Sequence, residues 1–177
     1  LSSIGRIEGE QREIKVWQLN LVNGEASAQE INDSNLLDQE LSILQTASNK
    51  YFAVFLTQSI TDQRISIWAY DLNTNSKQEY LLPTSTATVH FDGILLVQDR
   101  IYVYFIDSDN SAYELIRLNG YTGEVEAKFT FSNKSDLYVG NRYIYQLFTS
   151  PFGDQNKFRA LDSYTLNVID EGETSER

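Results

Sequence analysis

The stretch RLNGYTGEVEA, residues 117–127, has two glycines within four residues. A glycine-rich loop can bind phosphate when a helix begins directly after it, because the helix N-terminus then faces the anion. Here the loop is followed by EVEAKFTF, in which the apolar Val125, Ala127, Phe129 and Phe131 alternate with polar residues. Alternation with a period of two is typical of a strand. The stretch therefore predicts a turn between two strands and not a phosphate site.

Three other segments share the layout of this stretch. They are QLNLVNGEASA at 18–28, AYDLNTNSKQE at 69–79 and ALDSYTLNVID at 160–170, and the starts of the four segments are separated by 51, 48 and 43 residues. Self-similarity at such a period indicates a repeat architecture.

The shared residues have the chemistry of a hairpin turn. Asp or Asn at the third position and Asn or Thr at the sixth can accept backbone hydrogen bonds, and Gly or Asn at the seventh can take the positive φ that closes a turn. Leu166 departs from this pattern, so we expect a different geometry in the last turn. The predicted turn residues are Asn20, Gly24, Asp71, Thr74, Asn119, Thr122, Gly123, Asp162 and Thr165.

A second motif recurs about twenty residues before three of these turns. It reads NKYFAVF at 49–55, DRIYVYF at 99–105 and NRYIYQLF at 141–148, and each copy has Asn or Asp, a basic residue, and then aromatic and β-branched residues. The motif predicts that Asn49, Asp99 and Asn141 lie in matching tight turns that lead into buried strands.

Together these signals define a unit of four strands joined by three turns. The predicted strands are 41–47, 51–58, 65–71 and 77–82 in the second unit, 94–98, 101–107, 112–118 and 124–131 in the third, and 136–140, 143–149, 157–162 and 167–170 in the fourth. The first unit offers only three, at 1–7, 13–20 and 25–31. The helical spacing of Leu37, Leu41 and Leu44 leaves a short helix at 35–40 as an alternative.

Four-stranded antiparallel units that recur every 40 to 50 residues are typical of the blades of a β-propeller. We therefore expect an all-β chain of about four blades, with a partial blade at 1–31, full blades at 41–82, 94–131 and 136–170, and a polar tail at 171–177. The tail is a poor strand to complete the first blade, so we expect a segment of a larger propeller. Its open sheet edge and bare blade face should require a partner or further blades.

Two of the turn segments, ALDSYT at 160–165 and LNGYTGEV at 118–125, resemble the A-L-D-x-x-T-G-x-V-x-W repeat of quinoprotein-type, or PQQ-like, β-propellers. The likeness covers about ten residues in each of the four units. Where the family repeat ends in Trp, this chain has Ala28, Glu79, Ala127 and Asp170.

The missing Trp residues make the cofactor-binding members of that family a poor match. The resemblance instead implies the divergent scaffolding members, such as periplasmic outer-membrane assembly lipoproteins, the luminal propellers of stress-sensor kinases and the ER membrane-complex propeller subunit. It thereby implies that no cofactor is bound, and it favours an extracytoplasmic or ER-luminal location.

Composition narrows the classes of partner. The net charge of −11 disfavours binding to a nucleic-acid backbone or to anionic lipid. No apolar stretch reaches the roughly 18 residues that a transmembrane helix needs, so direct membrane insertion is not expected. Because the chain has no Cys, a thiol nucleophile and Cys-ligated zinc are excluded.

Few residues offer catalytic or metal-binding chemistry. His90 is the only histidine and stands between apolar residues, which favours a structural role. Asp107, Asp109 and Ser111 alternate as calcium ligands do, but the glycine of a calcium loop is missing. We therefore expect a solvated hairpin turn there and no bound metal.

Two tryptophans occupy equivalent places in the third strand of their units. Trp17 and Trp68 each stand shortly before the repeated Asn or Asp, and Leu115 or Ile116 and Phe158 fill that place in the other two units. Equivalent positions in successive blades indicate packing, and a sugar-binding aromatic platform is the alternative.

The function favoured by these patterns is binding without catalysis. We expect an interaction module that presents blade-edge loops to a protein partner, as a scaffold or as a subunit of an assembly complex. A carbohydrate- or ligand-binding propeller is the alternative, followed by a quinoprotein-like enzyme.

Overall fold

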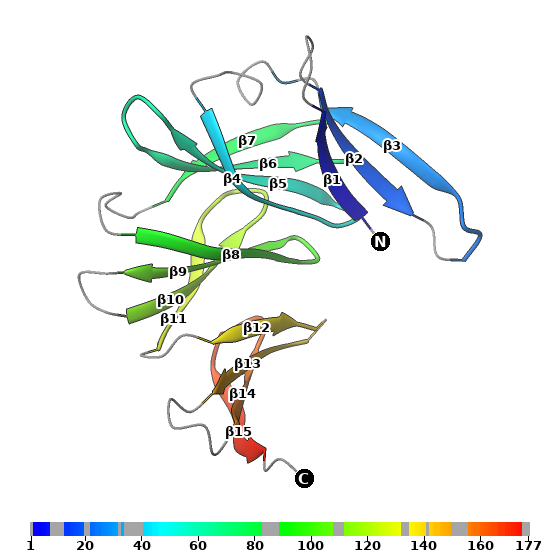
Figure 1. Cartoon of the computed structure of the whole chain (residues 1–177). Helices are drawn as coiled ribbons and strands as arrows, with labels where there is room; N and C mark the ends of the chain where they lie inside the picture. The colour runs from blue at the N-terminus through cyan, green and yellow to red at the C-terminus, as the bar shows by residue number, and fades with distance from the viewer. Residues whose placement is uncertain are drawn as a thin grey trace. The chain divides into compact units, whose positions relative to one another are not determined.

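The computed structural model describes residues 2–7, 13–19, 22–31, 33, 41–82, 89–107, 112–131, 135–140, 142–149 and 156–174. These residues form fifteen β-strands, and no helix is found among them (Figure 1). The all-β prediction is confirmed. The alternative helix at 35–40 lies outside the described residues.

The strands form four antiparallel sheets, which we call blades 1 to 4. Blade 1 has three strands and the other blades have four, and the order within each sheet follows the sequence. Blade 1 contains β1 (Ser2–Ile7), β2 (Glu13–Leu19) and β3 (Ala26–Ile31). Blade 2 contains β4 (Leu41–Ser48), β5 (Phe52–Ser59), β6 (Ile65–Asp71) and β7 (Lys77–Leu81).

The second half of the chain repeats this arrangement. Blade 3 contains β8 (Val89–Val97), β9 (Arg100–Asp107), β10 (Ala112–Asn119) and β11 (Val125–Phe131). Blade 4 contains β12 (Asp136–Val139), β13 (Tyr143–Thr149), β14 (Asn156–Asp162) and β15 (Val168–Thr174). We name the four strands of a full blade A to D in chain order, so that blade 1 contains strands B, C and D.

Two of the expected strand limits differ from the observed ones by more than one residue. β8 begins at Val89, before the expected start at 94, because it continues through a register shift between Phe91 and Gly93. β15 continues to Thr174, four residues into the segment expected as a polar tail. The extension pairs with strand C of blade 4, with Thr174 opposite Asn156. Because the pairing is made by backbone groups, it does not depend on the polarity of the side chains.

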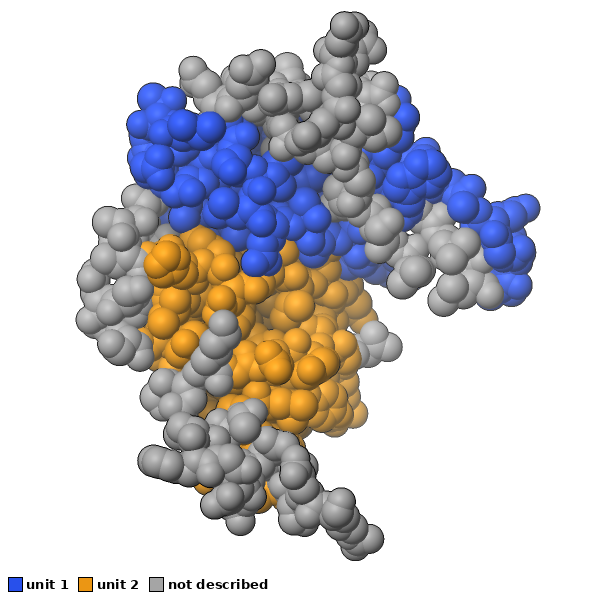
Figure 2. Space-filling model, viewed as in Figure 1, with its two compact units in different colours: residues 1–87, 120–123 blue, residues 88–119, 124–177 orange. Residues whose placement is uncertain are grey.

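The chain divides into two compact units (Figure 2). Unit 1 comprises residues 1–87 and 120–123, and unit 2 comprises residues 88–119 and 124–177. The core of unit 1 joins blades 1 and 2 through Ile14, Val16, Ile31, Ala53, Phe55, Trp68 and Tyr70. The core of unit 2 joins blades 3 and 4 through Val97, Tyr102, Tyr104, Leu115, Phe131, Ile144, Leu161 and Leu166.

The central strands explain the continuous apolar runs of the sequence. In β5, residues 52–57 are all buried, and in β9 residues 101–105 are all buried. Successive side chains of a strand point to opposite faces, so a strand that is buried throughout must be covered on both faces. By contrast, the outermost strand of blade 2, KQEYL, is mostly exposed, and its charged side chains protect a free sheet edge.

Candidate functional site

In blades 2 and 4, the turn between strands C and D is built around an aspartate side chain. In blade 2, Oδ1 of Asp71 accepts hydrogen bonds from the backbone amides of Asn73 and Thr74, at 2.8 and 3.2 Å. In blade 4, Oδ1 of Asp162 accepts from the backbone amides of Tyr164 and Thr165, at 2.9 and 2.8 Å. The predicted Asx turns are therefore present in both blades.

These hydrogen bonds favour the ionised carboxylate. The backbone amide of Thr165, helped by that of Tyr164, holds the pKa of Asp162 below its usual value against the opposing effect of burial. For Asp71, burial alone raises the pKa, but the amides of Asn73 and Thr74 outweigh it and the net pKa is lowered.

Every C–D turn closes with a residue at positive φ. Gly24 and Gly123 both have φ of 72°, Asn75 has 55° and Leu166 has 59°. The expectation of a different geometry at Leu166 is wrong. The amide of Leu166 donates to the carbonyl of Asp162, as that of Asn75 does to Asp71, so the two turns share one conformation.

The remaining predicted turn residues are placed as follows. The backbone amide of Asn119 donates to the carbonyl of Glu124, and its side-chain amide donates to Glu126 at 3.1 Å. Thr74 and Thr165 lie within the turns capped by Asp71 and Asp162, and Thr122 occupies the same place in blade 3. Asn20 lies outside the described residues.

The motif before strand B also lies in turns. Oδ1 of Asn49 accepts from the amides of Tyr51 and Phe52, at 2.8 and 2.9 Å, and Asp99 lies between β8 and β9. Asn141 is outside the described residues. The amide of Leu72 donates to the carbonyl of Tyr51, so the A–B and C–D turns of blade 2 are tied together.

The third residue of each C–D turn forms the tip of that turn. Val22 is 96% exposed, Tyr121 is 47% exposed and Tyr164 is 56% exposed, and blade 2 has Asn73 at this place. Three blades thus present a large apolar side chain at an equivalent exposed position. Tyr121 makes an edge-to-face contact with Phe52, with the ring centroids 5.0 Å apart.

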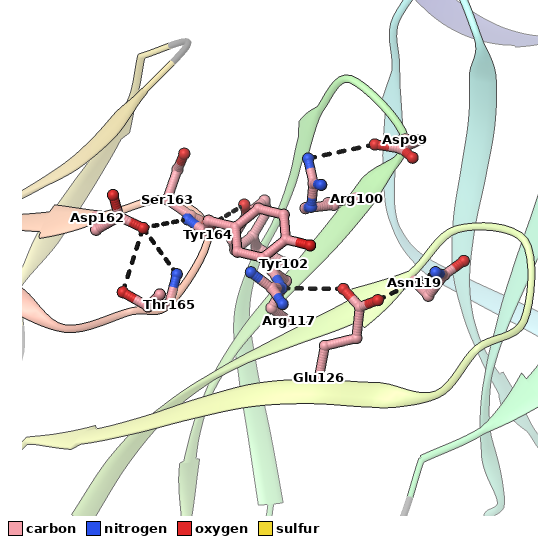
Figure 3. Close-up of polar contacts among 10 residues, drawn as sticks. All are labelled: Asp99, Arg100, Tyr102, Arg117, Asn119, Glu126, Asp162, Ser163, Tyr164 and Thr165. Atoms are coloured by element: carbon pink, nitrogen blue, oxygen red, sulfur yellow. Dashed lines mark hydrogen bonds and ion pairs between the residues drawn. The ribbon is translucent and has the colours of Figure 1, made fainter.

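Two guanidinium groups of blade 3 lie close to the ring of Tyr164 (Figure 3). The Cζ atoms of Arg100 and Arg117 each lie 4.4 Å from the centroid of its ring. The hydroxyl of Tyr102 donates to the backbone carbonyl of Ser163, which fixes the neighbouring backbone. Cation–π contacts of this kind favour one position of the ring, and Tyr164 is still 56% exposed to solvent.

Arg117 is a buried charge with incomplete hydrogen bonding. Its Nε lies 3.1 Å from the Glu126 carboxylate, which makes an ion pair. The contact does not have hydrogen-bond geometry, and neither Nε nor Nη1 has another hydrogen-bond partner in the described part of the chain. The ring of Tyr164 therefore contributes to the stabilisation of this guanidinium.

Unit 1 contains a polar cleft of about 500 Å³ between β3 and the end of β6. Its lining includes the buried carboxylate of Asp33, which accepts from the Tyr70 hydroxyl at 2.6 Å and pairs with the Lys77 ammonium. Burial, followed by the hydrogen bond to Asp33, raises the pKa of Tyr70 far above its usual value. At the rim, the Gln29 amide donates to Oδ1 of Asn75 at 2.6 Å.

The structure places the remaining metal-binding and catalytic candidates from the sequence as follows. His90 lies exposed in β8. Asp109 and Ser111 are outside the described residues, and only the backbone of Asp107 is described. Within the described ranges, no three His, Asp or Glu side chains are grouped so that they could hold a metal ion. In the same ranges, no helix has the length and apolar character needed to cross a membrane.

The two tryptophans differ in burial despite their equivalent positions. Trp68 packs in the core of unit 1, whereas Trp17 is exposed. Counting back three residues from the turn Asn or Asp places Ile116 and Arg159 at the same position in blades 3 and 4. The assignment of Phe158 to this position is therefore wrong by one residue. Because successive side chains of a strand point to opposite faces, Phe158 lies on the other face of the strand from Arg159.

The sequence could not have identified Tyr164 and Arg117 as partners. They are far apart in the sequence, and their contact depends on how blades 3 and 4 pack. The exposed tips carry a weak sequence signal, since Val22, Tyr121 and Tyr164 share one position of the repeat.

Comparison with solved structures identifies the fold. The chain is similar to the β-propeller domain of the Trilobed protease from Pyrococcus furiosus, with a TM-score of 0.57 and 10% identity, covering 99% of this chain and 53% of that one. It is similar to the acylaminoacyl peptidase of Pyrococcus horikoshii, with a TM-score of 0.57 and 12% identity, covering 99% of this chain and 30% of that one. AztD of Citrobacter koseri matches with a TM-score of 0.51 and 16% identity, covering 92% of this chain and 44% of that one.

These similarities show that the chain has the β-propeller fold, as the repeats predicted. The chain spans about half the length of the Trilobed protease propeller domain, and less of the other two proteins. No family model matches the sequence, and no curated protein matches it.

Proposed function

We propose that this propeller module acts as a protein-binding scaffold and not as an enzyme, and that it binds through the tips of its C–D turns. The observation that carries the proposal is the recurrence of an exposed large apolar residue, Val22, Tyr121 or Tyr164, at one position of three turns. Tyrosine and arginine are the residue types enriched at the energetic centres of protein interfaces.

The C–D turn of blade 4 also holds its tip, Tyr164, in place before a partner binds. The Asp162 carboxylate fixes the turn backbone, and Arg100 and Arg117 fix the ring of Tyr164. An ordered side chain loses less rotamer entropy on binding, so pre-ordering increases affinity.

Within the β-propeller fold, we propose that the blades are divergent quinoprotein-type repeats. The Asx-x-x-Thr pattern in the turns supports this proposal.

Site-specific photocrosslinking tests the proposal. A photoreactive amino acid is placed at Val22 or Asn73, both turn tips, and at Ile60 as the control. Ile60 is exposed but lies in a turn between strands B and C, at the opposite end of blade 2. We expect the two tips to crosslink the same protein and Ile60 not to do so.

Binding to the protein identified in this way then gives a quantitative test. Tyr164→Ser should weaken its affinity about tenfold or more, as expected for a hot-spot aromatic residue. Ile60→Ser should leave the affinity unchanged. Equal crosslinking from all three positions, or equal affinity of both variants, would reject the turn tips as the binding site.

The polar cleft of unit 1 favours a second candidate function, which is binding of a small polar ligand such as a carbohydrate. Its lining of amide, carboxylate, hydroxyl and ammonium groups offers both donors and acceptors. Calorimetric titration with a panel of sugars tests this, with Gln29→Ala expected to abolish any heat of binding. Heat that persists in that variant would place the ligand elsewhere.

A further inference from the structure

Asparagine is followed by glycine at two places in the chain, and both places belong to C–D turns. Asn23–Gly24 lies in the turn of blade 1, and Asn119–Gly120 lies at the start of the turn of blade 3. The backbone nitrogen of the residue after an asparagine can attack the side-chain amide. Glycine favours this attack, because it has no Cβ in the path and its backbone is conformationally permissive. The two pairs have the same intrinsic chemistry, so a difference between them has to come from the fold.

The Asn23–Gly24 pair is open to solvent. Residues 22–25 are all exposed. Gly24 has φ of 72°, and no atom from elsewhere in the described part of the chain lies within 4 Å of a Cβ added there. The nitrogen of Gly24 therefore has room to move towards the side chain of Asn23, and water has access to the product.

The side chain of Asn23 is also oriented and polarised within the turn. Its Oδ1 accepts a hydrogen bond from the backbone amide of Glu25 at 3.1 Å, and its Nδ2 donates to Oε2 of Glu25 at 2.7 Å. When a nitrogen adds to Cγ, negative charge develops on Oδ1, and an N–H that already points at this oxygen stabilises the charge. The backbone amide of Glu25 is therefore placed to assist the attack.

The Asn119–Gly120 pair is held in place by its surroundings. Gly120 is buried, and Asn119 is half-buried at the end of β10. The backbone amide of Asn119 donates to the carbonyl of Glu124 at 3.0 Å, and its side-chain amide donates to Glu126 at 3.1 Å. The carbonyl of Gly120 accepts from the Tyr80 hydroxyl at 2.9 Å. Attack requires rotation about the bonds that join the two residues, and contacts on both sides oppose that rotation.

We propose that Asn23 is a site of covalent self-modification, which converts it to aspartate and isoaspartate, and that the fold protects Asn119 from the same reaction. The nitrogen of Gly24 forms a bond to Cγ of Asn23 and loses its proton to water. The bond from Cγ to Nδ2 breaks, and Nδ2 takes up a proton and leaves as ammonia. The product of this step is a succinimide ring.

Water then opens the ring at one of its two carbonyl carbons. Aspartate forms when the bond from nitrogen to Cγ breaks, and isoaspartate forms when the bond from nitrogen to the backbone carbonyl carbon breaks. No oxidation or reduction takes place, and water is the only other reactant.

Both products change the turn tip of blade 1. Each adds a negative charge beside Val22, which is 96% exposed, and isoaspartate also inserts a methylene group into the backbone between β2 and β3. Weaker partner binding by the modified chain is a consequence that rests on the proposed function. The reaction itself needs only the chain and water, so it is tested without a partner.

Timed incubation of the folded 177-residue chain at mildly alkaline pH tests the proposal. After digestion, mass spectrometry follows the conversion of amide to acid in the peptide that contains each asparagine. We expect Asn23 to react at least tenfold faster than Asn119, because only Asn23 can reach the geometry of attack. Chromatography of the peptides should show both aspartate and isoaspartate at position 23, as opening of a succinimide requires.

The unfolded chain provides the matched control. In concentrated guanidinium chloride the contacts around Asn119 are lost, and both asparagines are followed by glycine. We expect their rates to agree there to within about twofold. A difference that persisted at its full size in the unfolded chain would mean that the fold does not protect Asn119.

Three variants test the individual contacts. Gly24→Ala should slow the reaction at Asn23 about fivefold or more, because a Cβ hinders the attacking nitrogen. Gly93→Ala, at a glycine in β8 that is equally free of neighbours, should leave that rate unchanged. Tyr80→Phe removes the hydroxyl that binds Gly120, so the reaction at Asn119 should become about twofold to tenfold faster. The rate at Asn23 should not change in Tyr80→Phe.

Three results would overturn the proposal. Equal rates at the two asparagines of the folded chain would mean that the fold does not discriminate between them. Retention of the amide at Asn23 while the unfolded chain reacts would mean that the turn of blade 1 is protected as well. Formation of aspartate without isoaspartate would mean that water hydrolyses the side chain directly and that Gly24 takes no part.

Discussion

At the scale of single residues, Leu166 shows how burial can override backbone preference. It has φ of 59°, in the left-handed region, yet only 2% of it is exposed. The left-handed conformation costs a non-glycine residue about 1–2 kcal/mol, whereas burying a leucine side chain contributes about 1.5–3 kcal/mol. Burial is the larger effect, which is why a turn that favours glycine can keep leucine.

A pair of substitutions separates these two effects. Leu166→Ala and Leu166→Gly should each lower the free energy of unfolding by about 2–5 kcal/mol, because both remove the buried side chain. The glycine variant should be the more stable of the two by about 1 kcal/mol, since alanine retains the cost of positive φ. Urea denaturation measures both.

The order of the two variants is the informative result, because glycine is normally less stable than alanine within regular structure. Ala127→Gly in β11 provides the ordinary case and should be destabilising. If Leu166→Ala proved as stable as Leu166→Gly, the assigned turn conformation would be incorrect.

At the scale of elements, the turn at 120–123 illustrates how one element fixes another. The hydroxyl of Tyr80 in β7 donates to the carbonyl of Gly120 at 2.9 Å, and the ring of Tyr80 lies against Gly123. A Cβ atom added at Gly123 would lie 2.1 Å from Cδ1 of that ring. Gly24 has the same φ of 72°, but no atom lies within 4 Å of an added Cβ there.

These two glycines form a matched pair for a stability measurement. Gly24→Ala should cost about 1 kcal/mol, which is the backbone cost alone. Gly123→Ala should cost about 1–3 kcal/mol more, because the ring of Tyr80 has to move. Chemical denaturation gives both values.

A double-mutant cycle identifies the source of the extra cost. In a Tyr80→Ala background, Gly123→Ala should cost no more than Gly24→Ala, because the ring that obstructs it is gone. An extra cost that survived removal of the ring would have to come from elsewhere in the turn.

The elements also show what a sequence can and cannot predict. The strands of blade 2 were predicted to within one residue at each end, because their apolar runs are bounded by Asx and polar turns. β8 was predicted too short, since the bulge near Asp92 interrupts the alternation that marks a strand. β15 was predicted too short because an edge strand can be polar and still pair through its backbone.

The candidate site was predicted only in its local part. Asp71 and Asp162 were recognisable because an Asx turn is made by residues adjacent in sequence. The stacking of Arg100 and Arg117 on Tyr164 was not recognisable, because it depends on the packing of side chains from different blades. The equivalence of Trp17 and Trp68 was correct, but their different burial depends on which blade faces are covered.

At the scale of the whole molecule, the tyrosines link folding to alkaline pH. Burial raises the pKa of Tyr80 in unit 1 and of Tyr102 in unit 2, each to about 12 from an ordinary value of 10.0. The folded state therefore holds the phenolic protons more tightly than the unfolded state does. Stability from these groups is fully present below pH 10 and is lost as the pH rises towards 12.

Tyrosinate absorbance provides the measurement. Of the eleven tyrosines, Tyr80 and Tyr102 should be among those that remain protonated at about pH 11 in the folded chain. In concentrated urea, all should titrate near their ordinary value. Tyr102→Phe should reduce the late-titrating fraction of the folded chain. Identical titration curves for the folded and unfolded chains would contradict the burial of these phenols.

The order of strands within the sheets has a consequence for how the chain is made. Each strand pairs only with its neighbours in sequence, and paired residues such as Phe52 and Asp71 are 19 positions apart at most in the described ranges. A hairpin of that size closes in about 1–10 μs. The ribosome adds about 5–20 residues per second, so a unit of 43–51 residues takes about 2–10 s to synthesise. Each blade can therefore form its own hydrogen bonds during translation, before the next blade has been synthesised. Only the packing of one blade on the next depends on synthesis of the later blade.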